Sequence, residues 1–173
     1  MEWRMLETTE EMQRLQQLLD ESAAGAGPHL RDIISDDRRL TAEQLSERLQ
    51  GMCLLVVATV TADGRPLVGP VDAYLLHGSF CFSSSRDSVR MRHLAARPAV
   101  SATHLPSEDL AVTVHGQAEL FDVLDPAHGE LRQAMLDNYL PKQGPEFEIW
   151  LDGANPIGAR VVADKMFTFS MGQ

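Results

Sequence analysis

A run of hydroxyl and basic side chains at residues 83–90 is the part of this sequence best suited to chemistry. It reads Ser-Ser-Ser-Arg-Asp-Ser-Val-Arg and joins a predicted strand to a predicted helix. The free N–H groups of a helix N-terminus favour an anion such as phosphate, and the guanidinium of arginine matches phosphate oxygens. A helix that already included Arg86 would place it on the same face as Arg90. From spacing alone, the commoner interpretation of this run is a serine-rich turn that caps a solvated basic helix.

Gly69-Pro70 is a second unusual feature, because it interrupts a strand-like run. A bulge or a sheet edge would explain it. Close approach of a flat ligand would explain it too, since glycine has no side chain to block the backbone. His93, His104 and His115 lie in different predicted elements, so we expect each to be a satisfied or exposed histidine and expect no metal site.

Composition and charge limit the partners. The chain has 173 residues, 44% of them hydrophobic, which is enough for one globular domain with a core. A net charge of −10 argues against binding to nucleic acid or to an anionic membrane. Cys53 and Cys81 lie in apolar runs, and we interpret them as buried free thiols, with a disulfide between them as the alternative.

The same sequence predicts a cytoplasmic protein. No apolar stretch approaches the length of a membrane span. Residues Met1–Arg4 lack the basic start and the apolar run of a signal peptide.

The elements that must position these residues fall into two parts. Residues 1–50 form a predicted helical N-terminal extension, in which capping boxes begin helices at Thr8 and Thr41. Residues 51–173 form the second part. Its six predicted strands are 53–61, 66–76, 79–84, 99–105, 110–121 and 158–170, the last with a bend at 164–165.

Turns and helices connect these strands. Asp63-Gly64 and His77-Gly78 are tight turns, so the strands they join are antiparallel. Predicted helices begin at Asp87 or Ser88, at Asp125-Pro126 and near Pro145. We therefore expect a mainly β, α+β fold: a six-stranded antiparallel barrel, which leaves no exposed edges, with flanking helices. Because prolines cannot donate to a ladder, part of the strand 66–76 should lie at an edge.

Several segments, in order, resemble the pyridoxamine 5′-phosphate oxidase-like superfamily. They are residues 58–66 (ATVTADGRP), 82–94 (FSSSRDSVRMRHL), 97–101 (RPAVS) and 114–120 (VHGQAEL). The resemblance covers about residues 50 to 122, with a weaker echo at 161–171. It implies a split β-barrel, usually a homodimer, with FMN at the dimer interface. Some relatives use the deazaflavin F420 instead, and a few bind haem.

The resemblance also implies roles for individual residues. The stretch 83–90 would hold the FMN phosphate, with Arg90 where the family often has lysine, and the second strand would run along the isoalloxazine ring. The cofactor-binding residues predicted in this way are Val68, Gly69, Pro70, Val71, Ser83, Ser84, Ser85, Arg86, Ser88 and Arg90. The candidates for substrate contact are Asp72, Tyr74 and His115, and the aromatic residues brought by the partner subunit would be Phe167 and Phe169.

The sequence also departs from true pyridoxamine phosphate oxidases. It has no arginine after Arg160, where those enzymes carry an Arg-rich substrate motif, and Gly69 and Tyr74 replace basic residues near the ring. We therefore predict an FMN-dependent oxidoreductase with a small-molecule substrate other than vitamin B6, in which the cofactor carries the chemistry and no catalytic residue stands out. The alternatives are an F420-dependent reductase, for which Arg86, Arg90 and Arg92 could supply a basic groove, a non-catalytic flavin- or haem-binding protein, and a barrel without a cofactor.

Overall fold

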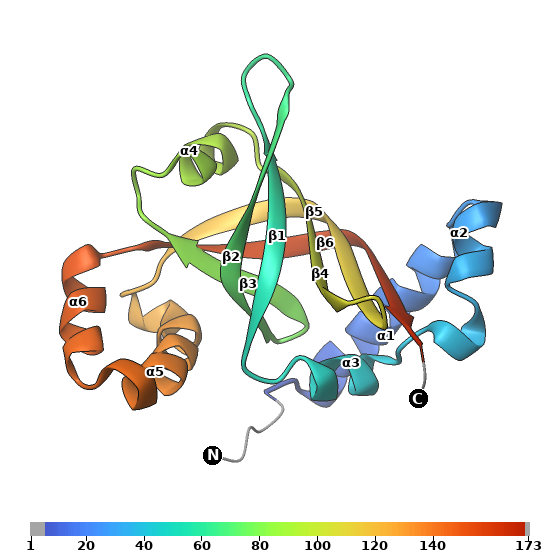
Figure 1. The fold of residues 1–173 in the computed structure, drawn as a ribbon, viewed down its shortest axis with the longest axis horizontal. Helices are drawn as coiled ribbons and strands as arrows, with labels where there is room; N and C mark the ends of the chain where they lie inside the picture. The colour runs from blue at the N-terminus through green and yellow to red at the C-terminus, as the bar shows by residue number, and fades with distance from the viewer. Residues whose placement is uncertain (1–5, 172–173) are drawn as a thin grey trace.

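Six strands close into a barrel in the order β1-β2-β3-β6-β5-β4 (Figure 1). The computed structural model describes residues 6–171, and every strand pair in it is antiparallel. The strands are β1 (Met52–Val60), β2 (Pro66–Leu76), β3 (Ser79–Ser84), β4 (Ala99–Ser107), β5 (Leu110–Asp122) and β6 (Ile157–Ser170). The predicted fold class is confirmed, because inward and outward side chains alternate along these strands as the sequence pattern requires.

The helices flank this barrel. They are α1 (Thr9–Ala24), α2 (Pro28–Ile33), α3 (Ala42–Arg48), α4 (Val89–Ala96), α5 (Gly129–Gln143) and α6 (Glu146–Ala154), with short 3₁₀ turns η1 (Asp36–Arg38) and η2 (Pro126–His128). Both capping boxes are present, at Thr8 and Thr41. Ser88 caps α4 by accepting a hydrogen bond from the Met91 N–H. The start predicted at Asp125-Pro126 is a 3₁₀ turn, and α5 begins three residues later, at Gly129.

A bulge in β6 gives the predicted bend. His115 of β5 pairs with Lys165, whereas the next residue, Gly116, pairs with Ala163. Asp164 is therefore left without a register partner, and a bulge of this kind increases the local bend and twist of the strand.

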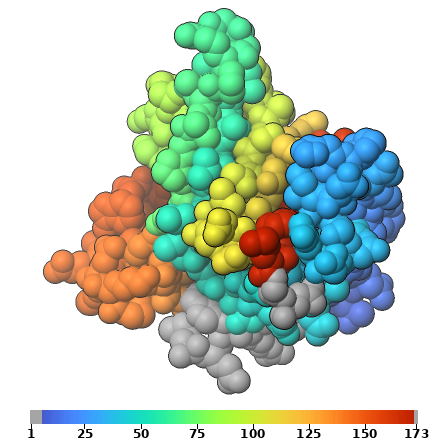
Figure 2. All heavy atoms as spheres, turned by 45° about the vertical axis from the view of Figure 1, so that its right-hand side comes forward, coloured from blue at the N-terminus to red at the C-terminus, as the bar shows by residue number. Residues whose placement is uncertain are grey.

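The hairpin of β1 and β2 separates from its neighbours at its tip, which projects beyond the barrel in both views (Figures 1 and 2). Strand β2 pairs with β3 only over Ala73–Leu76, although it pairs with β1 over Pro66–Tyr74. At residues 66–72, the edge of β2 that faces away from β1 therefore has no strand beside it. This confirms the expectation that Pro66 and Pro70 lie at an edge, where a missing N–H is tolerated.

The N-terminal helices share the core of the barrel. Leu15 and Leu19 of α1 and Leu45 of α3 belong to the same buried cluster as Met166 of β6. The backbone N–H of Leu40 donates to the Thr168 hydroxyl at 2.9 Å. The extension therefore packs on the barrel through apolar contacts and buried hydrogen bonds; the boundary near residue 50 stays a prediction.

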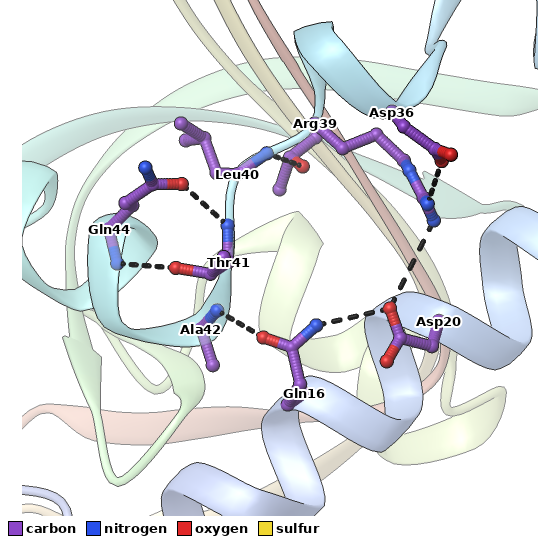
Figure 3. A network of polar contacts seen from close by, with 9 residues as sticks. Gln16, Asp20, Asp36, Arg39, Leu40, Thr41, Ala42 and Gln44 are labelled. Carbon is purple, nitrogen blue, oxygen red and sulfur yellow. Dashed lines mark hydrogen bonds and ion pairs between the residues drawn. The ribbon is translucent and has the colours of Figure 1, made fainter. Parts of the chain in front are cut away.

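A polar network links α1 to the segment before α3 (Figure 3). The Gln16 amide oxygen accepts a hydrogen bond from the Ala42 N–H at 2.8 Å, and its amide nitrogen donates to Asp20 at 3.1 Å. Arg39 lies between Asp20 and Asp36 and contacts both. These contacts fix the course of the chain between α1 and α3.

Both cysteines, Cys53 and Cys81, are buried free thiols, as predicted. Within residues 6–171, no helix has the length and apolar character needed to cross a membrane. Residues Met1–Arg4, on which the expectation about a signal peptide rests, lie outside the described residues.

Candidate functional site

A cavity of about 880 Å³ lies between the open edge of β2, the end of β3 and the helices α5 and α6. It brings together residues from three predicted groups: the serine run, Arg90 and the second strand. Its wall is formed by Pro70, Val71, Asp72, Tyr74, Ser83, Ser84, Ser85, Arg90, Met135, Tyr139, Gln143, Phe147, Trp150, Leu151, Ala154 and Pro156. Eight of these sixteen are residues that the sequence pointed to.

One end of the cavity is suited to an anion. Ser83 and Ser84, at the end of β3, and Ser85, which follows it, line this end, and the Ser83 hydroxyl donates to the Met135 sulfur at 3.5 Å. Arg90, in the first turn of α4, reaches the same space and is half-buried. Burial lowers the pKa of Arg90, because a guanidinium removed from water loses hydration. A bound anion would compensate for that loss through charge-assisted hydrogen bonds.

The open edge of β2 borders this end. The Arg90 guanidinium donates a long hydrogen bond, 3.4 Å, to the Pro70 carbonyl, which therefore points away from β1. Main-chain groups alternate in direction along a strand, so those of Val68 face the same open edge. A Cβ atom on Gly69 would lie 2.8 Å from the Arg90 guanidinium. A side chain at position 69 would therefore displace the end of the Arg90 side chain from its place against the strand.

The other two predicted cofactor contacts of the 83–90 run, Arg86 and Ser88, have other positions. Ser88 is the N-cap of α4, so its side chain stabilises the helix that carries Arg90. Arg86 precedes α4, which begins at Val89, so it does not share a helical face with Arg90. Its guanidinium pairs with Asp122 at 2.8 Å and donates to the Asn155 carbonyl at 2.8 Å. Arg86 therefore ties the end of β3 to the segments around α5 and α6 rather than lining the cavity.

Four predicted residues lie on the outer face of the barrel instead of in the cavity: Val68, His115, Phe167 and Phe169. Cross-strand pairs connect Phe167 to Pro70 of the cavity wall and His115 to Val68, two residues before Pro70 on β2. One row of register partners runs Pro70–Val56–Thr103–Thr113–Phe167, and the next runs Val68–Ala58–Ser101–His115–Lys165. His115 accepts or donates a hydrogen bond with the Ser101 hydroxyl at 2.8 Å and meets the Phe167 ring edge-on at 6.2 Å. These residues form one continuous face that begins at the cavity.

The three histidines considered as metal ligands lie apart. His93 is hydrogen-bonded to Thr59 at 3.1 Å, and His104 is hydrogen-bonded to the Leu54 carbonyl at 2.8 Å. In the part of the chain that the structure describes, no group of three His, Cys, Asp or Glu side chains could hold a metal ion.

Sequence reasoning missed the wall that α5 and α6 supply. Tyr139 donates a hydrogen bond from its hydroxyl to the Asp72 carboxylate, and its ring stacks at 4.7 Å on Phe147. Phe147 in turn lies 5.5 Å from Trp150. Met135 and Tyr139 share the apolar side of one helix, but that spacing equally fits packing into a core. Only the folded chain shows that this side faces a cavity.

The wall fits a phosphate-bearing planar cofactor. Three serine residues and a half-buried arginine suit a phosphate, and the open edge of β2 offers main-chain groups for hydrogen bonds to the polar edge of a ring. The absence of a side chain at Gly69 keeps that edge accessible.

Comparison with known proteins shows the family of this chain. The family model for pyridoxamine 5′-phosphate oxidase matches residues 41–150, which is most of the chain. The resemblance inferred from the sequence is thereby confirmed. No curated protein matches the sequence.

Solved structures share the fold at low sequence identity. The conserved hypothetical protein Rv2991 from Mycobacterium tuberculosis is 19% identical, with a TM-score of 0.62 over 78% of this chain and 88% of its own. HutZ, a haem storage protein from Vibrio cholerae, is 20% identical, with a TM-score of 0.61 over 78% of this chain and 97% of its own. An F420 reductase is 21% identical, with a TM-score of 0.53 over 68% of this chain and 91% of its own. At such identities the likeness concerns the fold alone.

Proposed function

We propose that this chain, which belongs to the pyridoxamine 5′-phosphate oxidase family, is an oxidoreductase that binds FMN in the cavity beside β2. The observation that carries the proposal is the meeting of Ser83–Ser85, Arg90 and the open edge of β2 in one cavity. Segments distant in sequence converge there on a set of groups that suits a ring and a phosphate together.

The residues of the cavity would have separate tasks. Arg90 and the three serine hydroxyls would hold the phosphate, and Ser88 would keep the helix start in place. The β2 edge at Val68 and Pro70 would orient the ring through its main-chain groups. FMN, when bound, supplies the hydride transfer. Binding, orientation and exclusion of water are then the work of the protein.

The first experiment compares FMN with riboflavin, which lacks the phosphate. Each flavin is titrated into the purified protein, and binding is followed by quenching of flavin fluorescence. We expect FMN to bind more tightly than riboflavin, and Arg90→Ala to remove most of that difference by weakening FMN about tenfold or more, since a charge-assisted hydrogen bond contributes about 1.5–3 kcal/mol. Arg92→Ala is the matched control, because Arg92 lies on the same helix but outside the cavity wall.

The outcomes separate the candidate cofactors. Equal loss of FMN and riboflavin in Arg90→Ala would remove Arg90 from the phosphate site. Binding of F420 in place of FMN would make the chain a deazaflavin reductase, and a Soret band on addition of haem would make it a haem-binding protein. A protein that binds none of the three contradicts the proposal.

We also propose that the chain is a homodimer in which the outer face of β1, β2 and β4 is the interface. Val68 and Leu105 on this face are 70% and 61% exposed, and Leu54 and Val56 lie between them on β1. Large apolar side chains gathered on one sheet face favour association. A groove of about 520 Å³ on this face shares Pro70 with the cavity wall. A second copy seated there would lie beside the cofactor.

This arrangement would give a role to the residues that the fold leaves outside the cavity. The two register rows lead from the cavity rim across the proposed interface to His115 and Phe167. In a symmetric dimer, these side chains, with Phe169, would approach the cavity of the partner subunit. Their assignment as partner contacts stays a prediction.

The oligomeric state tests the dimer proposal. We expect the wild-type protein to sediment as a dimer and Leu105→Glu to sediment as a monomer, because burying an unpaired charge opposes association. Ile149→Glu is the control, since Ile149 is also an exposed apolar residue but lies on α6, away from this face. A wild-type monomer at micromolar concentration would overturn the proposal.

A further inference from the structure

The cavity has a second end, at α5 and α6, whose chemistry differs from the serine end. Its walls are the rings of Tyr139, Phe147 and Trp150, which follow one another at centroid distances of 4.7 and 5.5 Å. Trp150 is 60% exposed, which is unusual for so large an apolar ring. Aromatic faces of this kind bind flat rings by offset or edge contacts.

The charge of this end is negative. Among the described residues of the wall, only Asp72 and Arg90 are charged, and Arg90 lies against Gly69 and Pro70 at the serine end. Asp72 is exposed and accepts the hydrogen bond from Tyr139 with one carboxylate oxygen. The other oxygen has capacity for a further donor.

Three acidic groups around Asp72 respond to its charge. Burial, together with the hydrogen bond and the charge of Asp72, raises the pKa of Tyr139 to about 12. Burial and the same charge raise the pKa of Cys53 to about 12. Burial chiefly raises the pKa of Tyr74, and Tyr139 and Asp72 add to the effect, whereas the nearby Asn138 lowers it. Each shift means that a further negative charge is disfavoured here.

Tyr74 adds a buried polar group to this end of the cavity. The residue is 2% exposed and lines the cavity, and its hydroxyl makes no hydrogen bond of normal geometry with any residue in the described range 6–171. A buried hydroxyl without a hydrogen bond of normal geometry is destabilising, because it has lost its contact with water. A ligand atom that accepts or donates at this position would recover that free energy.

We propose that the α5–α6 end of the cavity binds a planar aromatic compound that is neutral or cationic and carries an N–H donor, with Asp72 as the acceptor, Tyr74 as a second polar contact and Trp150 as a stacking surface. The inference rests on the proposed function, because it assigns to the substrate the part of the cavity that the cofactor phosphate does not use. It also excludes carboxylate- and phosphate-bearing substrates from this end.

Two probes of the same shape and opposite charge test the proposal. 2-Naphthylmethylammonium and 2-naphthoate are titrated by calorimetry into the protein, with and without saturating FMN. We expect the ammonium probe to bind at least tenfold more tightly than the carboxylate. Asp72→Asn should remove that preference, and Tyr74→Phe should weaken the ammonium probe a few-fold.

Two further variants keep the test decisive. Tyr139→Phe removes the hydrogen bond to Asp72 but keeps the carboxylate, so the preference for the cation should persist. Glu146→Gln is the matched control, because Glu146 is an exposed acid on α6 outside the cavity wall; it should change nothing. Equal affinity for the two probes in the wild type, or a preference that survives Asp72→Asn, would overturn the proposal.

The outcome is distinguishable from a failure of the cofactor proposal. If FMN binds and the two probes bind equally, the flavin site stands and the substrate inference is wrong. If FMN does not bind but the ammonium preference is present and depends on Asp72, the site at α5–α6 stands and the flavin proposal is wrong.

Discussion

Two sets of helices cover the barrel, and they use their apolar residues differently. The N-terminal set buries them: Leu45 of α3 is 0% exposed and packs with Leu15 and Leu19 in the barrel core. The α5–α6 pair buries one side, yet leaves Trp150 exposed beside the large cavity. The cavity between α1, η1 and β6 is about 170 Å³, compared with about 880 Å³ beneath α5 and α6. The first set serves stability, and the second shapes a binding space.

The largest expected effect on stability comes from truncating a buried side chain of the N-terminal helices. Leu45→Ala should destabilise the protein by about 2–5 kcal/mol, because it removes a fully buried side chain and leaves a cavity. Urea unfolding followed by circular dichroism measures the change. A loss below about 1 kcal/mol would mean that α3 does not contribute to the cooperative core.

A smaller loss should follow from removing a buried hydrogen bond in the same region. Thr168→Val keeps the side-chain shape but leaves the Leu40 N–H without an acceptor. We expect a destabilisation of about 1–3 kcal/mol by thermal or urea unfolding. Thr168→Ser restores the hydroxyl and should recover most of the loss; if it does not, the methyl group rather than the hydrogen bond is responsible.

A single histidine joins the two helical sets and should make stability depend on pH. His77, in the turn between β2 and β3, contacts Glu11 of α1 and Glu130 of α5, each at 2.9 Å. Burial alone would lower the pKa of His77, but its hydrogen bonds to the two carboxylates outweigh burial and raise that pKa above its ordinary 6.5. Stability from protonated His77 is therefore present at low pH and lost as the pH rises through the raised pKa.

Glu11 responds in the opposite direction. The hydrogen bond from His77 lowers the pKa of Glu11 from 4.5 to about 2, so its contribution is present above pH 4.5 and lost as the pH falls toward 2. We expect the urea midpoint to fall between about pH 6 and pH 9 by the equivalent of about 1 kcal/mol, and His77→Gln to remove that change. An unchanged slope in His77→Gln would show that another group titrates.

The smallest effect on stability should come from the α5–α6 pair. Trp150→Ala removes a large side chain, yet the free energy of unfolding should change by less than about 1 kcal/mol, because most of that side chain remains in contact with water. A loss as large as that of Leu45→Ala would show that α6 is part of the core and would abolish the contrast between the two sets.

The sequence alone predicted the strands and helices well, because the signals that mark them involve residues close together in the chain. Capping boxes at Thr8 and Thr41, the turn at His77-Gly78 and the alternation along β5 depend on near neighbours. The strand boundaries agree with the structure within two residues for the same reason. Gly69-Pro70 correctly indicated an edge, because neither a missing side chain nor a missing N–H suits the middle of a sheet.

The sequence by itself determined the serine run, the cap of α4 and the proline-marked edge of β2, since each depends on residues a few positions apart. Tertiary structure alone decided which of these residues meet. It turned Arg86 toward Asp122, left Arg90 in the cavity, and brought Tyr139 to Asp72 from 67 residues away. Such contacts are set by how the barrel closes and where α5 packs, because side chains of the same type and spacing can face solvent, core or cavity until the whole chain is folded.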